Sequence, residues 1–209
     1  MSNGCVFGII TVPKRAKEVE YMVEEIKKVG FRDEDIFIFN DEELRGQPFN
    51  FDRMLKFFCE NSERFKDKHI FMSTDDVEFK PGWFDKYTRA LDNTDFPIIT
   101  GFVNKVVNTD NKKVTDLGDF KVVDISGTSA YYDVCNVWRK GFLDKVHYNL
   151  FRFYETNSTK NRDKKHYDVC YNNFLNYNHT RFGLIMKNAV TCLDVPSTLK
   201  HGIKINKDL

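Results

Sequence analysis

The sequence predicts an α/β protein whose central sheet is mostly parallel, with some antiparallel strands, and is flanked by helices. Two observations lead to this fold class. Short, nearly continuous apolar runs recur along the first half of the chain, and segments with apolar residues at the helical period lie between them. Strands that are buried on both faces have continuous apolar runs, and strands that alternate with helices form parallel sheets.

The first half of the chain is expected to supply the parallel part of the sheet. Strands are predicted at residues 5–10, 36–39 and 69–72. Residues 16–29 place their apolar side chains on one helical face, Asn50 is expected to cap a second helix, and Pro81 to begin a third. Residues 42–49, which contain Arg-Gly-Gln-Pro, are expected to form a loop before the second helix.

The second half is less regular and is expected to add a small antiparallel portion. Strands are predicted at residues 96–103, 120–125 and 186–195, and helices at residues 133–145 and 166–177. Lys112–Val114 follows a turn-forming segment and is expected to return as a hairpin. No repeat or linker divides the sequence, so we expect a single domain over residues 1–209.

Composition excludes several classes of partner. A formal net charge of +1 argues against a chain-wide nucleic-acid or membrane-surface footprint. Five cysteines without C-x-x-C spacing indicate free thiols in a reducing compartment, so a cytoplasmic location is expected. The first ten residues lack the pattern of a signal peptide, and no apolar run approaches the length of a membrane span.

Two adjacent carboxylates, Asp75 and Asp76, follow the third predicted strand. In an open α/β sheet, ligands bind beyond the carboxyl ends of the strands. Carboxylate oxygens at such an edge suit a hard divalent cation that carries a phosphate-bearing ligand. The same pair would also suit a turn or a helix N-terminus that binds nothing.

The sequence lacks the glycine-rich motifs with which many α/β proteins hold phosphates. Neither G-x-G-x-x-G nor G-x-x-x-x-G-K-[ST] occurs, and Gly8 stands alone in the first strand. A cation held by Asp75 and Asp76 is therefore the available way to hold a phosphate group.

The segment from Thr74 to Trp83, TDDVEFKPGW, resembles the acidic DXD motif of nucleotide-sugar-dependent glycosyltransferases of the GT-A fold, although Thr74 replaces the first acid. The resemblance implies a Rossmann-like GT-A domain. About residues 1–105 would bind the nucleotide sugar and about residues 106–209 the acceptor. A narrower resemblance, to glycosyltransferase domains of large algal viruses, implies a location in the host cytoplasm.

The resemblance also implies a set of site residues. Asp76 and His201 would hold Mn²⁺ or Mg²⁺, and Asp168 would be the catalytic base. The nucleotide sugar would contact Thr11, Arg15, Asn40, Asp41 and Asp75, and the acceptor would contact Ser126, Gly127 and Thr128. The implied reaction moves a hexose or deoxyhexose from a UDP-sugar to a hydroxyl group of a glycan acceptor.

The residue types fit that reaction. Breaking the sugar–phosphate bond leaves a diphosphate with growing negative charge, which a divalent cation stabilises. The attacking hydroxyl group loses its proton to a base. Three of the residues also suit roles without a ligand: Asp168 a helix N-terminus, His201 a solvated chain end, and Arg15 a surface ion pair.

Two other functional classes remain open from the sequence. A nucleotidyltransferase would share a similar sheet and metal, but it would normally carry a first loop rich in glycine and arginine, and Thr11–Arg15 contains no glycine. A non-enzymatic domain that binds sugars or proteins would use the two acids structurally.

Overall fold

A computed structural model describes residues 4–43, 47–101, 110–127, 135–142, 180–186 and 189–192. In its first half the elements are β1 (Cys5–Thr11), the 3₁₀ turn η1 (Pro13–Arg15), α1 (Ala16–Lys28), the 3₁₀ turn η2 (Asp33–Asp35), β2 (Ile36–Asn40), α2 (Gln47–Glu60), α3 (Ser62–Phe65), β3 (His69–Thr74), β4 (Val77–Phe79) and α4 (Trp83–Asn93). They are followed by β5 (Ile98–Thr100), β6 (Val114–Asp116), β7 (Lys121–Asp124), β8 (Cys135–Trp138), β9 (Phe182–Ile185) and β10 (Val190–Cys192).

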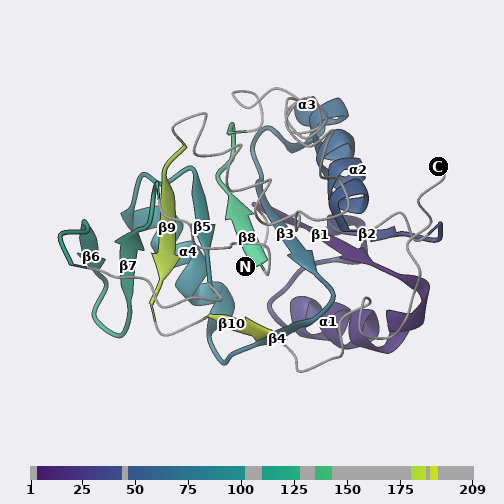
Figure 1. Ribbon diagram of the computed structural model, residues 1–209, viewed down its shortest axis with the longest axis horizontal. Coiled ribbons are helices and arrows are strands. Elements are labelled where there is room, and N and C mark those ends of the chain that lie inside the picture. The colour runs from purple at the N-terminus through teal and green to yellow at the C-terminus, as the bar shows by residue number, and fades with distance from the viewer. Residues whose placement is uncertain are drawn as a thin grey trace, which may run out of the picture.

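Within these residues, eight strands form one mixed sheet in the order β2-β1-β3-β8-β5-β9-β7-β6 (Figure 1). β1 runs parallel to both β2 and β3, and β9 runs parallel to β5. β4 and β10 pair antiparallel in a separate small sheet. The α/β fold class, with a parallel core, flanking helices and a small antiparallel portion, is therefore confirmed.

Both faces of the sheet are buried, which explains the continuous apolar runs. In β1, Phe7 and Ile9 pack into the cluster that contains the apolar faces of α1 and α4. Val6 and Ile10, which point to the other face, pack into the cluster formed by α2 and α3. The period-two alternation of side chains thus gives each strand two apolar faces rather than one.

Gly8 allows α2 to lie directly on β1. A Cβ atom at this position would stand 2.6 Å from Met54 Sδ and 2.9 Å from Phe58 Cε2. Any larger residue would push α2 away from the strand. This close approach also places the first turns of α2 beside the carboxyl ends of β1 and β2.

Two predictions about the second half are wrong. Residues 135–138 form strand β8 and not part of a helix over 133–145, because they fill the space between β3 and β5 and pair antiparallel with both. Lys112–Val114 does not pair with β5, the described strand within the predicted segment 96–103. β6 instead pairs with β7, while β8 and β9 occupy the two sides of β5.

Other boundaries differ in smaller ways. α2 begins at Gln47, so Asn50 lies inside the helix rather than at its N-cap, and the predicted loop over 42–49 is shorter. β9 was not predicted, and within the described part of the last predicted strand, Val190–Cys192 form β10, which pairs with β4. The predicted helix over 166–177 lies outside the described residues.

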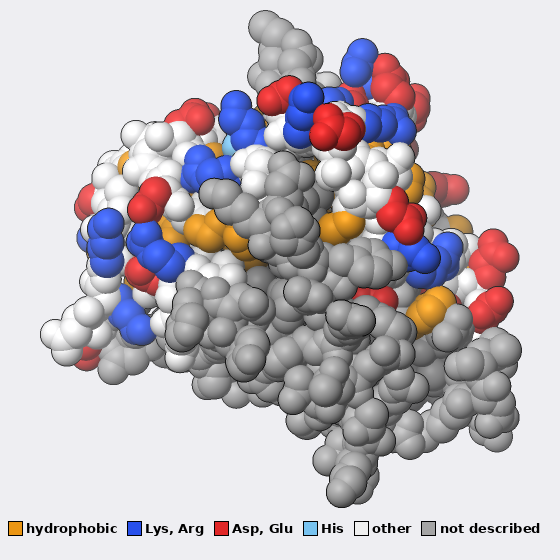
Figure 2. Space-filling model, turned by 90° about the horizontal axis from the view of Figure 1, so that it is seen from above, with side chains coloured by type: hydrophobic (Ala, Val, Ile, Leu, Met, Phe, Trp, Pro, Cys, Tyr) orange, Lys and Arg blue, Asp and Glu red, His pale blue; other side chains and the backbone are white. Residues whose placement is uncertain are grey.

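On the face drawn in Figure 2, the described residues show no gathering of one charge. Figure 2 shows basic and acidic side chains interspersed over the described part of one face, in keeping with the formal net charge of +1. Within the described residues, no helix has both the length and the apolar composition needed to cross a membrane.

Candidate active site

Three strands end together at one edge of the sheet. Because β1, β2 and β3 are parallel neighbours, their carboxyl ends bring the Thr11–Arg15 loop, Asn40–Asp41 and Asp75–Asp76 to the same edge. This is the edge at which open α/β sheets bind ligands. The structure therefore brings together the residues predicted to contact the nucleotide sugar.

Thr11, Arg15 and the two acids form one connected group. The Thr11 hydroxyl donates to Asp75 Oδ2 at 2.7 Å, and Arg15 Nη1 donates to Asp75 Oδ1 at 2.6 Å. Arg15 Nη1 also lies 3.6 Å from Asp76 Oδ2. The side chains of Asp75 and Arg15 are only 6% and 11% exposed, whereas that of Asp76 is 32% exposed. Asp75 is thus held in place from both sides, and Asp76 is the acid that still faces solvent.

Burial dominates the electrostatics of this group. It raises the pKa of Asp75, and the nearby Asp76 carboxylate adds to that effect, while Thr11 and Arg15 oppose it. Burial by itself would lower the pKa of Arg15, but the carboxylates of Asp75, Asp76 and Glu18 together raise it. A buried ion pair of this kind holds as long as both partners are present, and loss of one leaves a costly unpaired charge.

Asn50 connects the ends of β1 and β2 by hydrogen bonds. The sequence predicted only that it would cap a helix. Its side chain is buried, and Nδ2 donates to the carbonyl oxygen of Thr11 at 3.1 Å and to that of Phe39 at 2.5 Å. The backbone N–H of Asp41 donates to the same Thr11 oxygen at 2.9 Å. Asn50 therefore fixes the backbone from which Thr11 reaches Asp75.

Two buried polar atoms at this edge have no hydrogen-bond partner within the described residues. They are Thr74 Oγ1 at the end of β3 and Asn40 Oδ1 at the end of β2. Buried polar groups are nearly always paired, so each of these atoms calls for a partner. A polar ligand or a water molecule at the edge would supply one.

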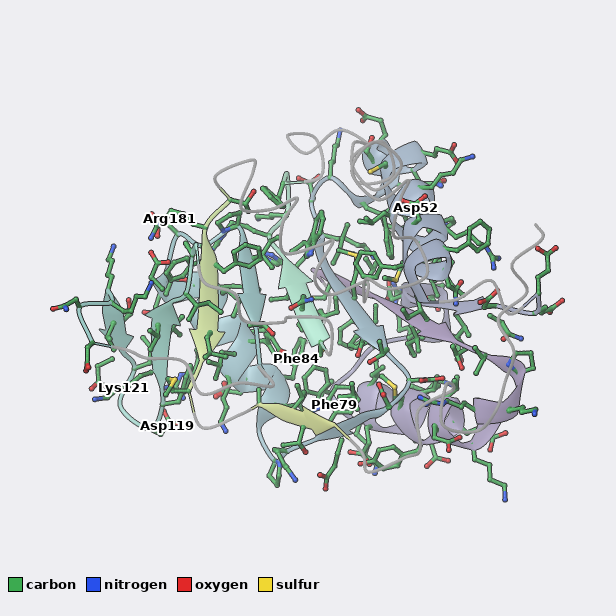
Figure 3. All side chains as sticks on the ribbon, in the orientation of Figure 1. Asp52, Phe79, Phe84, Asp119, Lys121 and Arg181 are labelled. Atoms are coloured by element: carbon green, nitrogen blue, oxygen red, sulfur yellow. The ribbon has the colours of Figure 1, made fainter. Side chains whose placement is uncertain are left out.

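Ser126 and Gly127, two of the three predicted acceptor residues, lie at a different edge of the sheet. β7 runs opposite to β9, which follows β5 and β3 in direction, so Ser126 and Gly127 after β7 lie at the edge opposite to Asp75. In Figure 3, Lys121 at the start of β7 and Arg181 before β9 lie at opposite ends of the sheet. The Ser126 hydroxyl donates to Asp124 Oδ1 at 2.5 Å and accepts from the Phe182 N–H at 2.9 Å, which are structural contacts. Thr128, Asp168 and His201 lie outside the described residues.

A divalent cation fits the acidic edge in its donor chemistry. Mg²⁺ and similar ions are bound by one or two carboxylates, together with water and substrate phosphates. Asp76, with its exposed oxygens, would be the first of these ligands, and Asp75 is the adjacent oxygen donor. Within the described residues, no three His, Cys, Asp or Glu side chains are gathered in a way that could hold a metal by themselves.

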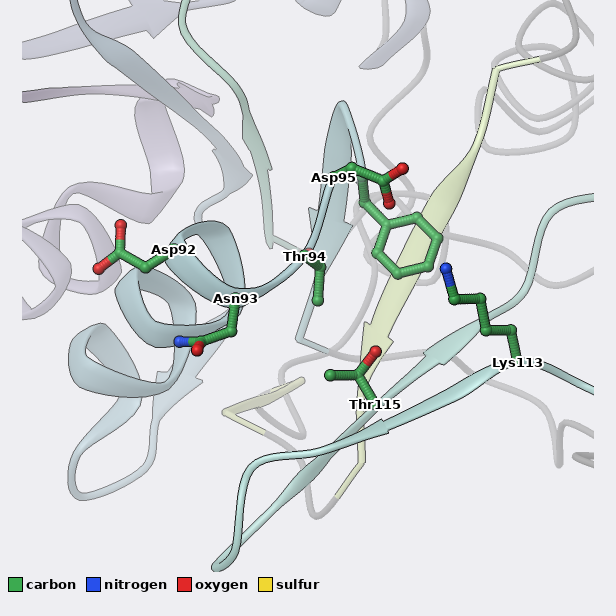
Figure 4. Close-up of a pocket in the computed structure, with 7 residues that line it drawn as sticks. Asp92, Asn93, Thr94, Asp95, Lys113 and Thr115 are labelled. Atoms are coloured by element: carbon green, nitrogen blue, oxygen red, sulfur yellow. The ribbon is translucent and has the colours of Figure 1, made fainter.

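A hollow of about 410 Å³ lies away from this group. It is lined by Asp92–Phe96, from the end of α4 to the segment before β5, and by Lys113 and Thr115 at the start of β6 (Figure 4). The Arg181 guanidinium lies 4.7 Å from the centre of the Phe96 ring and pairs with Asp95 at 2.8 Å. The hollow is thus at the opposite edge from the acids and contains none of the predicted site residues.

No known protein-family model matches this sequence, and no curated protein matches it either. Among solved structures, the chain is similar to a nucleoside-diphosphate-sugar pyrophosphorylase from Vibrio cholerae RC9, with a TM-score of 0.47 and 13% identity over 97% of this chain and 82% of that one. It is also similar to an inositol-1-phosphate CTP transferase from T. maritima, with a TM-score of 0.44 and 12% identity over 96% of each chain. Neither likeness reaches a TM-score of 0.5, so a functional conclusion has to come from the geometry of the site.

Proposed function

We propose that this chain is a glycosyltransferase that binds a UDP-sugar and a divalent cation at the carboxyl edge of β1, β2 and β3. The observation that carries the proposal is the connected group of Thr11, Arg15, Asp75 and Asp76. Two loops that are far apart in sequence meet there, with one acid fixed by its neighbours and the next one open to solvent.

Each residue of the group would have a part in holding the donor. Asp76 would be a metal ligand, and the bound Mn²⁺ or Mg²⁺ would supply positive charge to the departing diphosphate. Arg15 would add a second positive charge near the phosphates. Asn40, whose side-chain oxygen is an unpaired acceptor, would suit an N–H group of the base, such as the imide of uracil.

The proposed roles of the acceptor-binding residues have less support than those of the donor-binding residues. Asp168 as the base that removes the proton from the acceptor hydroxyl, and His201 as a further metal ligand, are proposed from the family resemblance alone. Ser126 and Gly127 are not carried forward as acceptor contacts, because they lie at the opposite edge of the sheet.

The competing candidate is a nucleotidyltransferase, the class named for both similar structures. That reaction needs a loop that surrounds a triphosphate, usually with successive backbone N–H groups. The loop after β1 is poorly suited to this, because Pro13 has no N–H and the Arg15 N–H already donates to the Val12 oxygen at 2.9 Å. This feature favours glycosyl transfer over nucleotidyl transfer.

A product assay separates the candidates. The chain is incubated with Mn²⁺ and a panel of UDP-sugars, and in parallel with nucleoside triphosphates and sugar 1-phosphates. Release of UDP supports the proposal, whereas release of pyrophosphate from the triphosphates would show a nucleotidyltransferase. If neither product forms and UDP does not bind, a non-enzymatic domain is the better conclusion.

A further inference from the structure

Arg15 contacts both Asp75 and Asp76, the two carboxylates beside which the proposed function would place a divalent cation. Its Nη1 lies 2.6 Å from Asp75 and 3.6 Å from Asp76, and its side chain is almost fully buried. Glu18, in the first turn of α1, adds a further negative charge near the guanidinium. The protein thus neutralises part of its acidic edge with its own side chain.

This arrangement opposes a metal ion that arrives alone. Such an ion would compete with Arg15 for the carboxylates, would be repelled by the guanidinium charge, and would have to break the buried ion pair of Arg15 with Asp75, which is unfavourable. A nucleoside diphosphate removes this obstacle, because its phosphate oxygens are good partners for a guanidinium. Arg15 would then exchange one anionic partner for another.

We propose that Arg15 is an internal counter-ion that makes the site bind a divalent cation and a nucleoside diphosphate together, so that the ligand is their complex rather than either one alone. The inference rests on the proposed function and extends it to the form in which the donor is recognised. By linkage, each of the two ligands must raise the affinity for the other by the same factor.

Replacement of Arg15 should change the affinity for Mn²⁺ alone and the affinity for UDP in opposite directions. Binding of Mn²⁺ alone is measured from the electron paramagnetic resonance signal of the free ion, and binding of UDP by calorimetry with and without Mn²⁺. For the wild type we expect weak binding of Mn²⁺ alone and a mutual enhancement of roughly 5- to 150-fold, the usual range of such couplings. Arg15→Met should bind Mn²⁺ alone more tightly, bind UDP less tightly in Mn²⁺, and lose most of the enhancement.

A matched control replaces a different basic side chain that pairs with a buried carboxylate. Lys68 lies 2.5 Å from the buried Asp35, near the amino ends of β2 and β3. Lys68→Met therefore also removes a cationic partner of a buried carboxylate, which keeps Arg32 at 3.0 Å, but at the other edge of the sheet. It should leave the binding of Mn²⁺ and of UDP unchanged.

The outcomes separate this inference from the proposed function. If the wild type binds UDP in Mn²⁺ but Arg15→Met binds Mn²⁺ alone no more tightly than the wild type does, the counter-ion role is wrong and the proposed function stands. If the wild type binds no UDP in Mn²⁺, both fail. If Arg15→Met does not fold, Arg15→Met/Asp75→Asn removes both charges of the pair together, so that no unpaired Asp75 carboxylate is left buried. That double variant should bind Mn²⁺ alone more tightly than Asp75→Asn does, and equal binding would overturn the inference.

Discussion

Arg15 and Asp75 lie 60 residues apart in the chain, yet the guanidinium and the carboxylate meet at 2.6 Å. The contact joins the loop after β1 to the end of β3, and it forms because these two strands are parallel neighbours. With Thr11 on the other oxygen of the same carboxylate, the end of one strand orients the acid at the end of the next. The proposed donor site is therefore organised before any ligand arrives.

Thr11→Val should destabilise the fold and weaken UDP binding. The change keeps the shape of the side chain but removes the hydroxyl that donates to Asp75, and a hydrogen bond to a charged group contributes about 1.5–3 kcal/mol. Thr11→Ser should keep most of both properties. Urea unfolding and calorimetry measure the two effects. Thr88→Val, which removes a hydroxyl that donates to carbonyl groups of its own helix, should be close to neutral.

Asn50→Leu should disturb the same site from a greater distance. The change removes the buried amide that donates to the carbonyl oxygens of Thr11 and Phe39, and each lost hydrogen bond should cost about 0.5–1.5 kcal/mol, while the Thr11 oxygen keeps the Asp41 N–H. Because Thr11 would lose its fixed backbone, affinity for UDP should fall as well. Asn93→Ala removes an amide that donates to a carbonyl group of an exposed helix end, and it is the control. Equal effects of the two substitutions on UDP affinity would show that Asn50 does not position Thr11.

The sequence alone predicts the acidic edge at the carboxyl ends of β1, β2 and β3, because short segments of the sequence determine where each of these strands ends. Each of β1, β2 and β3 is an apolar run that ends in polar residues, and parallel strands place such ends side by side. This pattern placed Asp75 and Asp76 at the edge, whereas Thr11, Arg15, Asn40 and Asp41 were added by the family resemblance, and the pairing of β1 with β2 and β3 brings all six to the same edge.

The rest depends on how strands pair, which the sequence pattern does not reveal. Residues 135–138 are apolar enough for a helix or a strand, and only their place between β3 and β5 decides. The direction of β7 is set by its antiparallel pairing with β9, and this is why Ser126 lies far from Asp75. Asn50 carried a capping signal, but its side chain reaches across to two other strands instead.

Gly8→Ala should destabilise the chain by about 1–3 kcal/mol, the usual cost of overpacking a core. The added methyl group would meet Met54 at 2.6 Å and force α2 away from β1. Gly4→Ala is a matched control, since a methyl group there would have nothing within 4 Å. Urea unfolding should show a clear loss for the first variant and almost none for the second. Similar losses in both would mean that α2 adapts easily.

His69 should make stability depend on pH between about 4 and 6.5. Burial lowers the pKa of His69 from 6.5 to about 4, and Arg139 and Lys140 act in the same direction. The unfolded chain therefore binds a proton at a higher pH than the folded chain does, so the free energy of unfolding should fall as the pH drops through this window.

His69→Gln isolates this effect because the other titrating groups are the same in both proteins. The difference in unfolding free energy between wild type and variant should shift in favour of the variant as the pH falls from 6.5 to 4. Urea unfolding at several pH values measures it. A difference that stays constant over the window would contradict the neutral, buried state of His69, which accepts a hydrogen bond from the Lys140 N–H at 3.2 Å.

The central claim is that the acidic edge after β3 binds a nucleoside diphosphate with the help of a divalent cation, and calorimetric titration of UDP tests it most directly. The titration is run with and without Mn²⁺ on wild type, Asp76→Asn and Asp119→Asn, an exposed acid at another place on the surface. We predict that Mn²⁺ strengthens UDP binding in the wild type and in Asp119→Asn, and that this gain is lost in Asp76→Asn. Equal UDP affinity of the wild type and Asp76→Asn in Mn²⁺ would contradict the account.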